Sequence, residues 1–384
     1  MKKKVISFSL ALVIFLSSFS ISSFAAENDA VIETKAKSAV LMCTDTGDIV
    51  YENNSHERLH PASVTKIMSL LLFVEAIESG KMSLDENVTV SAYASKKGGS
   101  QIWLKENEQM SVRDLLKATA VASANDACTA LAEKVAGSES SFVKLMNIRA
   151  KELGMKDTNF ENCTGLDDTA QNHLTSAYDI AVMSRELIKH EMIKEYTTIW
   201  MDKLRNGQTE LTNTNKLIRF YDGATGLKTG TTAKAGSCLS ATATRDGISF
   251  VAVVMGCSTS DDRFEGAKAL LNYGFANYSL YTPKIDENSI ANVNIEGGVA
   301  NSVKPIAEII NPVLIKKGDE EKIKYSVNLP QQVSAPVEKG QILGEVIISK
   351  DGKQIGKINL KSPEEIQKNS FWKEFVQMLR LFVE

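Results

Sequence analysis

The stretch His60-Pro-Ala-Ser-Val-Thr-Lys66 stands where an apolar helix should begin. Pro61 suits the first turn of a helix, and apolar residues then recur at helical spacing until Gly80, at Ile67, Leu70, Leu71, Val74 and Ile77. One helical turn separates Ser63 from Lys66, so the pattern places a hydroxyl and an amine on one face of the helix start. Free backbone N–H groups there favour an anion that develops nearby.

A second polar stretch, Ser123-Ala-Asn125, lies between two helical patterns. Ser111 with Asp114 resembles a capping box and predicts a helix over 112–121. Residues 126–135 then continue as a helix with one apolar face. A loop held between two packed helices can point a hydroxyl and a carboxamide into a cleft, where Asn125 would hydrogen-bond the backbone of a bound peptide.

The third stretch, Lys228-Thr-Gly230, opens a β segment. Two strongly β-forming runs, 237–244 and 248–255, flank the turn Arg245-Asp-Gly247 and predict a hairpin. Gly230 has no side chain, so a bound peptide could run close to the strand edge as an added strand.

Together the three stretches form an ordered S-x-x-K, S-x-N and K-T-G series, separated by about 60 and then about 105 residues. This series is typical of enzymes that form a serine acyl-enzyme with β-lactams or D-Ala-D-Ala peptides. Single matches carry little weight, since Ser141-Phe-Val-Lys144 and Ser326-Val-Asn328 match the first two patterns by chance. The K-T-G triplet occurs once, and the order and spacing carry the prediction.

The chemistry of such enzymes assigns a role to each residue. Ser63 is the expected nucleophile, and a neutral Lys66 is the expected general base. Burial and a second cation both lower the pKa of a lysine, and Lys228 is a candidate for that cation. Ser123 would pass a proton to the leaving amine. The backbone N–H groups of Ser63 and Thr231 would form an oxyanion hole.

Further segments make the chain similar to the low-molecular-mass penicillin-binding proteins, the serine-type D-alanyl-D-alanine carboxypeptidases of peptidase family S11. The resemblance is dense over roughly 35–280 and rests on His60-Pro-Ala-Ser-Val-Thr-Lys66, Ala122-Ser-Ala-Asn-Asp-Ala127, Leu153-Gly-Met155, His173-Leu-Thr-Ser-Ala-Tyr-Asp179, Gly226-Leu-Lys-Thr-Gly-Thr-Thr232 and Val253-Val-Met-Gly256. It implies the α/β penicillin-recognition fold, also called β-lactamase-like or transpeptidase fold. It also implies that the cleft is lined by Asn125, Lys228, Thr229, Gly230, Thr231 and Arg263.

Arg263 has two interpretations from sequence. The resemblance suggests that its guanidinium, with Lys228 and Thr229, holds the terminal carboxylate of the substrate, a task that suits the bidentate fork of arginine. It could equally be a surface residue that caps a helix over 262–276. Some relatives carry another arginine upstream of the K-T-G strand, but this chain reads Asn213-Thr-Asn215 there.

The predicted activity is removal of the terminal D-Ala from peptidoglycan pentapeptide stems, with β-lactams as covalent inhibitors and no cofactor or metal. D,D-endopeptidase action on cross-links would use the same residues. A class A β-lactamase is the rival with the same chemistry, and such an enzyme needs an extra glutamate in an omega-like loop. Here the only glutamate of the segment 159–173 is Glu161, which is followed by Asn162-Cys-Thr-Gly-Leu166 rather than by an E-x-x-L-N pattern. A non-catalytic wall-binding scaffold is the rival from another class, and the intact motif residues argue against it.

The first 25 residues predict export. Three lysines at 2–4 precede the apolar run 5–16, and Ser23-Phe-Ala25 is a small–x–small cleavage site of a signal peptide. The 44 basic and 47 acidic residues give a net charge of −3, and loss of three lysines with no acid would take it to −6. No basic stripe appears, so nucleic acid is not an expected partner. We expect an exported protein held at the outer face of the cytoplasmic membrane.

The cysteines and histidines indicate neither a metal site nor a disulfide framework. Five cysteines are widely spaced without a C-x-x-C pair, and four histidines are scattered along the chain. The cysteines are therefore expected to be small buried residues. The histidine pattern offers no Ser-His-Asp arrangement, which agrees with a lysine as the base.

The chain is expected to comprise the signal peptide 1–25, a catalytic domain over 26–281, a small all-β domain over 282–365 and an amphipathic helix over 366–384. The β domain would be a stalk, a partner platform or only a folding appendage. In the tail, Phe371, Phe375, Met378, Leu379 and Phe382 share one helical face. Residues 371–384 are too few to span a bilayer, and we expect them to lie in the membrane interface, with packing on a protein domain as the alternative.

Overall fold

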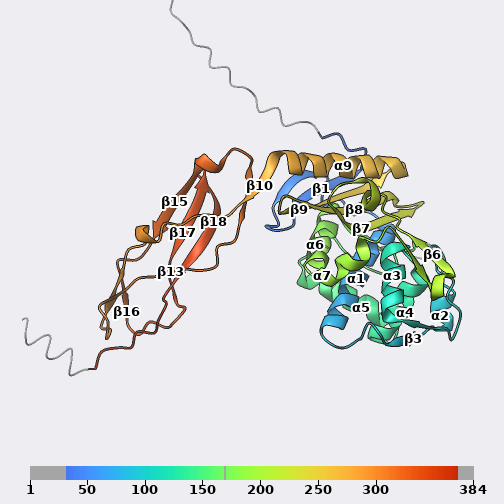
Figure 1. Ribbon diagram of the computed structural model, residues 1–384, viewed down its shortest axis with the longest axis horizontal. Coiled ribbons are helices and arrows are strands. Elements are labelled where there is room, and N and C mark those ends of the chain that lie inside the picture. The colour runs from blue at the N-terminus through green and yellow to red at the C-terminus, as the bar shows by residue number, and fades with distance from the viewer. Residues whose placement is uncertain (1–31, 168–169, 371–384) are drawn as a thin grey trace, which may run out of the picture. The chain divides into compact units, whose positions relative to one another are not determined.

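The computed structural model describes residues 32–167 and 170–370 of the 384-residue chain (Figure 1). The predicted signal peptide and the predicted interfacial helix 371–384 lie outside the described residues. The first residues of the tail region, 366–370, are extended rather than helical, because Ile366 forms a bridge with Val337 and Lys368 one with Gly298. Among the described residues, none belongs to a helix long and apolar enough to cross a membrane.

A five-stranded antiparallel sheet forms the centre of the catalytic region, in the order β2–β1–β9–β8–β7. Its strands are β1 (Ser38–Cys43), β2 (Ile49–Asn53), β7 (Ala224–Thr232), β8 (Gly236–Arg245) and β9 (Ile248–Cys257). The predicted hairpin is confirmed, and Asp246 and Gly247 both have positive φ, as a two-residue primed turn requires. The opening strands β1 and β2 join the same sheet beside β9, and β7 is left at its edge.

Helices cover both faces of this sheet (Figure 1). The helix α9 (Ser260–Asn277) packs on one face, where Gly274 lies so close that a Cβ would come within 3.0 Å of Phe250. The opposite face carries α6 (Ala177–Ile188), which packs on the buried helix α1 (Lys66–Glu78). Around α1 lie α3 (Val112–Val121), α4 (Asn125–Ala136) and α5 (Glu139–Glu152). The helices predicted over 112–121 and 126–135 are thus confirmed.

The predicted helix from Ser63 is only partly right. Residues Ala62–Thr65 form a 3₁₀ turn, η1, and the α-helix begins at Lys66. Ala62 has φ +48°, so the chain enters the helix through a tight turn that the apolar periodicity does not reveal. The remaining elements of this region are α2 (Ala92–Ser95), α7 (Glu191–Thr197), η2 (Arg205–Gly207), α8 (Leu217–Phe220) and the pairs β3 (Asn87–Thr89) with β4 (Gln109–Ser111) and β5 (Met201–Leu204) with β6 (Thr209–Thr212).

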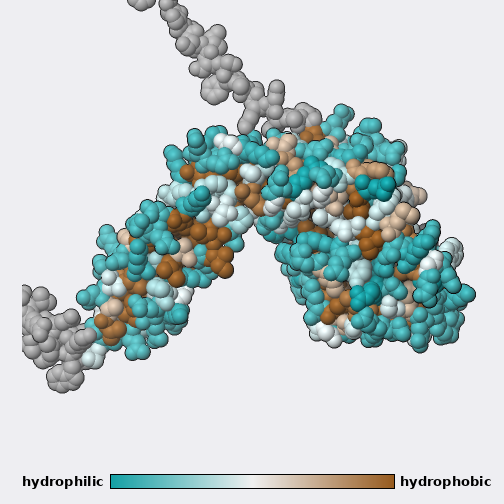
Figure 2. Space-filling view, viewed as in Figure 1, coloured by the Kyte–Doolittle hydropathy of each residue, from teal (hydrophilic) through white to brown (hydrophobic). Residues whose placement is uncertain are grey.

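The described residues beyond 281 form strands and two 3₁₀ turns, η3 (Glu287–Ser289) and η4 (Glu320–Lys322), which confirms the all-β prediction. The strands are β11 (Val293–Glu296), β12 (Ser302–Val303), β13 (Ile306–Ala307), β14 (Val313–Lys316), β15 (Ile323–Asn328), β16 (Gln332–Ser334), β17 (Ile342–Lys350) and β18 (Lys353–Lys361). They pair as β13–β18–β17–β15 and β12–β11–β16, while β14 pairs with β10 (Tyr278–Tyr281). Figure 2 shows hydrophobic side chains among hydrophilic ones over β17 and β18.

All five cysteines are buried and none is in a disulfide, which confirms their prediction as small buried residues. The described ranges hold no group of three His, Cys, Asp or Glu side chains placed to bind a metal ion.

Candidate active site

Ser63 is held between two glycines of distant segments. A Cβ on Gly230 would lie 2.7 Å from the carbonyl oxygen of Pro61 and 3.0 Å from the backbone nitrogen of Ser63. A Cβ on Gly165 would lie within 2 Å of the carbonyl oxygen of Ala62. The edge strand β7 and the loop at 165 therefore pack backbone against backbone on η1. From sequence, Gly230 was predicted to leave room for a bound peptide. The structure adds that η1, the turn that carries Ser63, also requires a glycine at this position.

Lys66 is fully buried at the first position of α1. Its Nζ donates to Ser63 Oγ at 3.0 Å, to Asn125 Oδ1 at 2.5 Å and to the carbonyl oxygen of Thr164 at 2.9 Å. Burial lowers the pKa of Lys66 to about 8. At neutral pH about one lysine in ten is therefore neutral and able to take a proton from the hydroxyl beside it.

Ser123 lies in the loop between α3 and α4 with φ +63°. This left-handed conformation is uncommon for a residue with a side chain, and strained residues of this kind cluster at active sites as well as in turns. Its Oγ is buried and has no hydrogen-bond partner among the described residues. A buried hydroxyl without a partner is costly, so this one is prepared for a partner that the chain does not supply.

Asn125 begins α4 and serves as a link inside the site. Its Oδ1 accepts from Lys66, while its Nδ2 donates to the carbonyl oxygen of Gly98 at 2.7 Å. Its backbone nitrogen donates to Ser100 at 2.7 Å. Only the substrate contact was predicted. The side-chain nitrogen has a second hydrogen to donate, but the contacts in the structure position the lysine.

Lys228 and Thr229 are buried side by side in β7. Lys228 Nζ donates to the carbonyl oxygen of Thr229 at 3.2 Å. Burial lowers the pKa of Lys228 well below its ordinary value, and the charges of Lys66 and Arg263 lower it further. Thr229 Oγ1 donates to Thr214 Oγ1 at 2.7 Å.

Arg263 is only 8% exposed, so its interpretation as a surface residue is wrong. It lies in the first turn of α9, which begins at Ser260 rather than at 262. Its Nη1 donates to the carbonyl oxygen of Gly230 at 3.0 Å and to Thr231 Oγ1 at 2.8 Å. Its Nε is buried without a partner among the described residues. The guanidinium thus lies directly against the K-T-G segment.

Three cationic side chains therefore gather near Ser63, and none of Lys66, Lys228 and Arg263 forms a salt bridge within the described residues. An unneutralised positive cluster attracts an anion, since each charge is only partly screened in a buried site. The sequence assigned the low pKa of Lys66 partly to Lys228. In the structure burial is the leading cause of the low pKa of Lys66, and the repulsion between the two lysines adds to the lowering of the pKa of Lys228.

The comparisons with known proteins agree with this geometry. The family model for D-alanyl-D-alanine carboxypeptidase (peptidase S11) matches residues 23–259, and that for the C-terminal domain of penicillin-binding protein 5 matches 278–368. The chain belongs to the peptidase S11 family of D-alanyl-D-alanine carboxypeptidases. The predicted penicillin-recognition fold and D-alanyl-D-alanine carboxypeptidase activity are confirmed at this level.

Individual relatives cover almost the whole chain. D-alanyl-D-alanine carboxypeptidase DacF of Bacillus subtilis is 40% identical over 94% of both chains. Penicillin-binding protein 5 of Haemophilus influenzae has a TM-score of 0.80 at 32% identity, covering 88% of this chain and 98% of its own. The ampicillin-bound form of penicillin-binding protein D2 of Listeria monocytogenes has a TM-score of 0.56 at 32% identity, and it covers 64% of this chain and 99% of its own.

Several residues of this carboxypeptidase were not found from sequence. Thr164 acts through its carbonyl oxygen, which any residue type could supply, so no sequence signal marks it. Thr214, from the segment upstream of β7, accepts a hydrogen bond from Thr229. His173 was part of the family resemblance only. Burial lowers its pKa to about 4, and its neutral ring joins Glu161 N at 3.0 Å to Thr65 Oγ1 at 2.8 Å.

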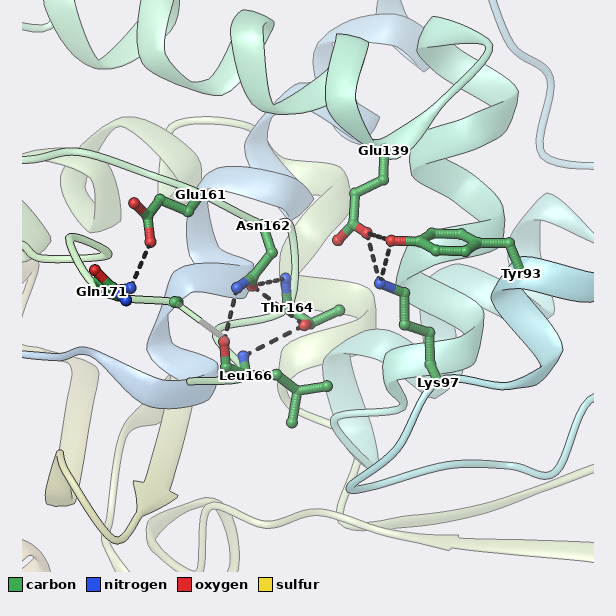
Figure 3. A pocket seen from close by; sticks show the side chains of 9 residues that line it. Tyr93, Lys97, Glu139, Glu161, Asn162, Thr164, Leu166 and Gln171 are labelled. Atoms are coloured by element: carbon green, nitrogen blue, oxygen red, sulfur yellow. Dashed lines mark hydrogen bonds and ion pairs between the residues drawn. The ribbon is translucent and has the colours of Figure 1, made fainter. Parts of the chain in front are cut away.

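A buried network supports the carbonyl that holds Lys66 (Figure 3). Glu139 Oε1 accepts from the backbone nitrogen and from Sγ of Cys163, both at 3.1 Å, next to Thr164. Its other oxygen binds Lys97 Nζ and Tyr93 OH, both at 2.5 Å. Burial acts to raise the pKa of Glu139, but these hydrogen bonds outweigh it and lower the pKa. The network lines a cavity of about 690 Å³ beside the catalytic residues.

Proposed function

We propose that the enzyme removes the terminal D-Ala from peptidoglycan stem peptides through an acyl-enzyme on Ser63. The contact of 3.0 Å between Lys66 Nζ and Ser63 Oγ, with the pKa of the buried lysine at about 8, carries this proposal. Neutral Lys66 takes the hydroxyl proton while Oγ attacks the carbonyl carbon between the two D-alanines. The backbone N–H groups of Ser63 and Thr231 receive the oxyanion.

The proton then moves to the leaving group. Ser123 has a free buried hydroxyl and serves as the relay from Lys66 to the amine of D-Ala, so the peptide C–N bond breaks as that nitrogen gains a proton. Water attacks the ester that remains and gives its proton to Lys66. As the bond between the acyl carbon and Ser63 Oγ breaks, Lys66 returns that proton to Oγ, which restores Ser63 and releases the shortened stem. The steps balance without a cofactor.

The positive cluster selects the carboxyl end of the substrate. Lys228, Thr229 and Arg263 lie along or against β7, so a peptide that adds to this edge would place its terminal carboxylate beside them. A bound carboxylate would raise the pKa of Lys228 and so stabilise its charged form. A free terminal carboxylate is present on every carboxypeptidase substrate.

We also propose that β-lactams acylate Ser63 and leave slowly. The relative from Listeria monocytogenes has an ampicillin-bound form, which supports this behaviour. Glu161 is the glutamate of the segment 159–173, in which a class A β-lactamase would carry its extra base. Its Oε2 accepts from Gln171 N at 2.9 Å and from Asn172 N at 3.1 Å. Because Glu161 Oε2 is bound by these two backbone nitrogens, Glu161 is not available as the glutamate base that a class A β-lactamase uses to hydrolyse its β-lactam ester.

The test is D-alanine release from a pentapeptide ending in D-Ala-D-Ala, measured with the chain from residue 26. Ser63→Ala should abolish release, whereas Ser141→Ala, which alters the chance S-x-x-K match on α5, should leave it unchanged. No release by the native chain, or equal release by Ser63→Ala, contradicts the proposal.

We further propose export of the enzyme and peripheral attachment to the outer face of the cytoplasmic membrane, on the basis of residues 1–25 and 371–384. The chain from residue 26 should co-sediment with vesicles that contain anionic lipids. A chain ending at residue 370 should stay in the supernatant with its D-alanine release intact. Equal sedimentation of the two chains would contradict the attachment.

A further inference from the structure

A second groove is lined by none of the catalytic residues and has no role in the chemistry above. One wall is the segment 102–108, and the other is the hairpin of β5 and β6 with its 3₁₀ turn. The groove has a volume of about 800 Å³. It is lined by Ile102, Trp103, Lys105, Glu106, Asn107, Glu108, Arg205, Gln208, Thr209 and Glu210.

Trp103 is the distinctive residue of this groove, since 75% of its surface is exposed. Its backbone has φ +58°, a left-handed conformation that is unfavourable for a bulky residue. The neighbours impose this geometry. The backbone nitrogens of Ile102 and Leu104 both donate to the carboxylate of Asp126, and both side chains are buried. The indole is therefore turned away from the core into solvent.

Arg205 makes the groove a preformed feature. Its Nη1 donates to the carbonyl oxygen of Ile102 and to Thr209 Oγ1, both at 2.9 Å, so one guanidinium joins the two walls. Its Nε forms a salt bridge of 2.7 Å with Glu108. A site whose walls are fixed before binding loses less entropy when a ligand enters.

Along the chain, both walls adjoin segments that contact active-site residues. The segment preceding Trp103 supplies the carbonyl oxygens of Gly98 and Ser100 that bind Asn125. On the other wall, β6 ends two residues before Thr214, which bonds Thr229 of the K-T-G segment. Each wall is thus separated by only a few residues of chain from a contact to the active site.

The lining indicates the chemistry of the ligand. The groove combines one flat exposed indole with amide, hydroxyl and mixed-sign charged groups, so it favours neither an ion of one sign nor a purely apolar ligand. A sugar ring fits this description, because one face of a pyranose is a row of C–H groups that stacks on an indole while its hydroxyl and amide groups face polar partners.

We propose that this groove binds the N-acetylated amino-sugar chain that carries the stem peptide, with Trp103 stacked on a sugar ring. This inference rests on the proposed function, which supplies a substrate whose peptide is attached to such sugars. The enzyme then prefers stems that are still joined to glycan over free peptides.

The test compares kcat/KM for a free pentapeptide with kcat/KM for the same pentapeptide on its amino-sugar disaccharide. The native enzyme should favour the disaccharide form by about fivefold or more, the effect of one stacking contact. Trp103→Ala should remove this preference without changing the rate on free pentapeptide, and Trp103→Phe should keep part of it. Ile148→Ala, at another exposed apolar residue, is the matched control.

Three results would overturn the inference: no preference in the native enzyme, an unchanged preference in Trp103→Ala, or an equal loss on both substrates. A change in solution mass on Trp103→Ala with the preference intact would make the groove a contact between copies. If the native enzyme cleaves neither substrate, the proposed function fails. Sugar binding in the groove is then tested separately, by quenching of tryptophan fluorescence with the disaccharide. Quenching that Trp103→Ala removes supports it, and equal quenching contradicts it.

Discussion

Lys66 is suited to act as a base because burial lowers its pKa while three acceptors hold its amine in place. Removal from water disfavours the charged amine, while Ser63 Oγ, Asn125 Oδ1 and the carbonyl oxygen of Thr164 hold it in place. The result is a base with a pKa of about 8, within reach of the nucleophile. This balance gives two predictions on pH dependence.

The rate of acylation should follow the titration of Lys66. The protonated lysine cannot accept a proton, so kcat/KM should rise about tenfold per pH unit below the pKa and level off above about 8. The measurement is the second-order rate constant of acylation by a chromogenic β-lactam across this pH range, which should show the same rise below the pKa. A flat profile, or a midpoint near the ordinary lysine value, would contradict Lys66 as the base.

Asn125→Asp should shift the rise of the acylation rate to higher pH. The change places a carboxylate at the position of Oδ1, 2.5 Å from Nζ, and an adjacent negative charge raises the pKa of a lysine. A rise of one to two units would slow acylation at pH 7 by about 10- to 100-fold. Asn125→Ala is the control, since it removes the contact without adding charge and should lower the rate more than it moves the midpoint.

At the scale of elements, the active site depends on close backbone packing between β7 and η1. Gly230→Ala should reduce acylation by about 100-fold or more, because its Cβ meets backbone atoms of Pro61 and Ser63 that cannot rotate away. Gly266→Ala on α9 is the matched control, since its Cβ meets Val254 at an ordinary 3.5 Å. Acylation rates and melting temperatures of both variants test this. Equal rates would show that the packing is not needed.

The start of α5 should also influence the site. Glu139→Ala removes the acceptor that fixes Cys163 beside Thr164 and leaves Lys97 unpaired, so it should cost about 3 kcal/mol of unfolding free energy and slow acylation. Lys97→Met breaks the ion pair but keeps the contact to Cys163. It should therefore lower the melting temperature while largely preserving the acylation rate. Equal slowing in both variants would argue against positioning through Cys163.

The elements also show what sequence reasoning can reach. The helix 112–121 and the β8–β9 hairpin were predictable because capping residues, apolar periodicity and turn residues are local signals. The motif residues were predictable from their types and order. Thr164, Gly165 and Thr214 were not, because they act through a carbonyl oxygen, the lack of a side chain and a contact between distant segments. The left-handed Ser123 was likewise hidden from any periodic pattern.

At the scale of the whole molecule, all nine predicted site residues lie before α9 ends, and none lies in the β region beyond residue 281. The relative from Listeria monocytogenes is covered over 99% of its length by only 64% of this chain. A chain of residues 26–281 should therefore acylate at the native rate. The measurement is the same β-lactam reaction, with circular dichroism to verify folding. A folded but inactive product would assign the β region a part in the site.

The central claim is that Ser63 carries the acyl group, and the most direct measurement is the mass of the protein after reaction with a penicillin, followed by peptide mapping. The account predicts one adduct of the intact antibiotic on the peptide that contains Ser63, lost in Ser63→Ala and retained in Ser141→Ala. An adduct on another residue, or one that persists in Ser63→Ala, would contradict it.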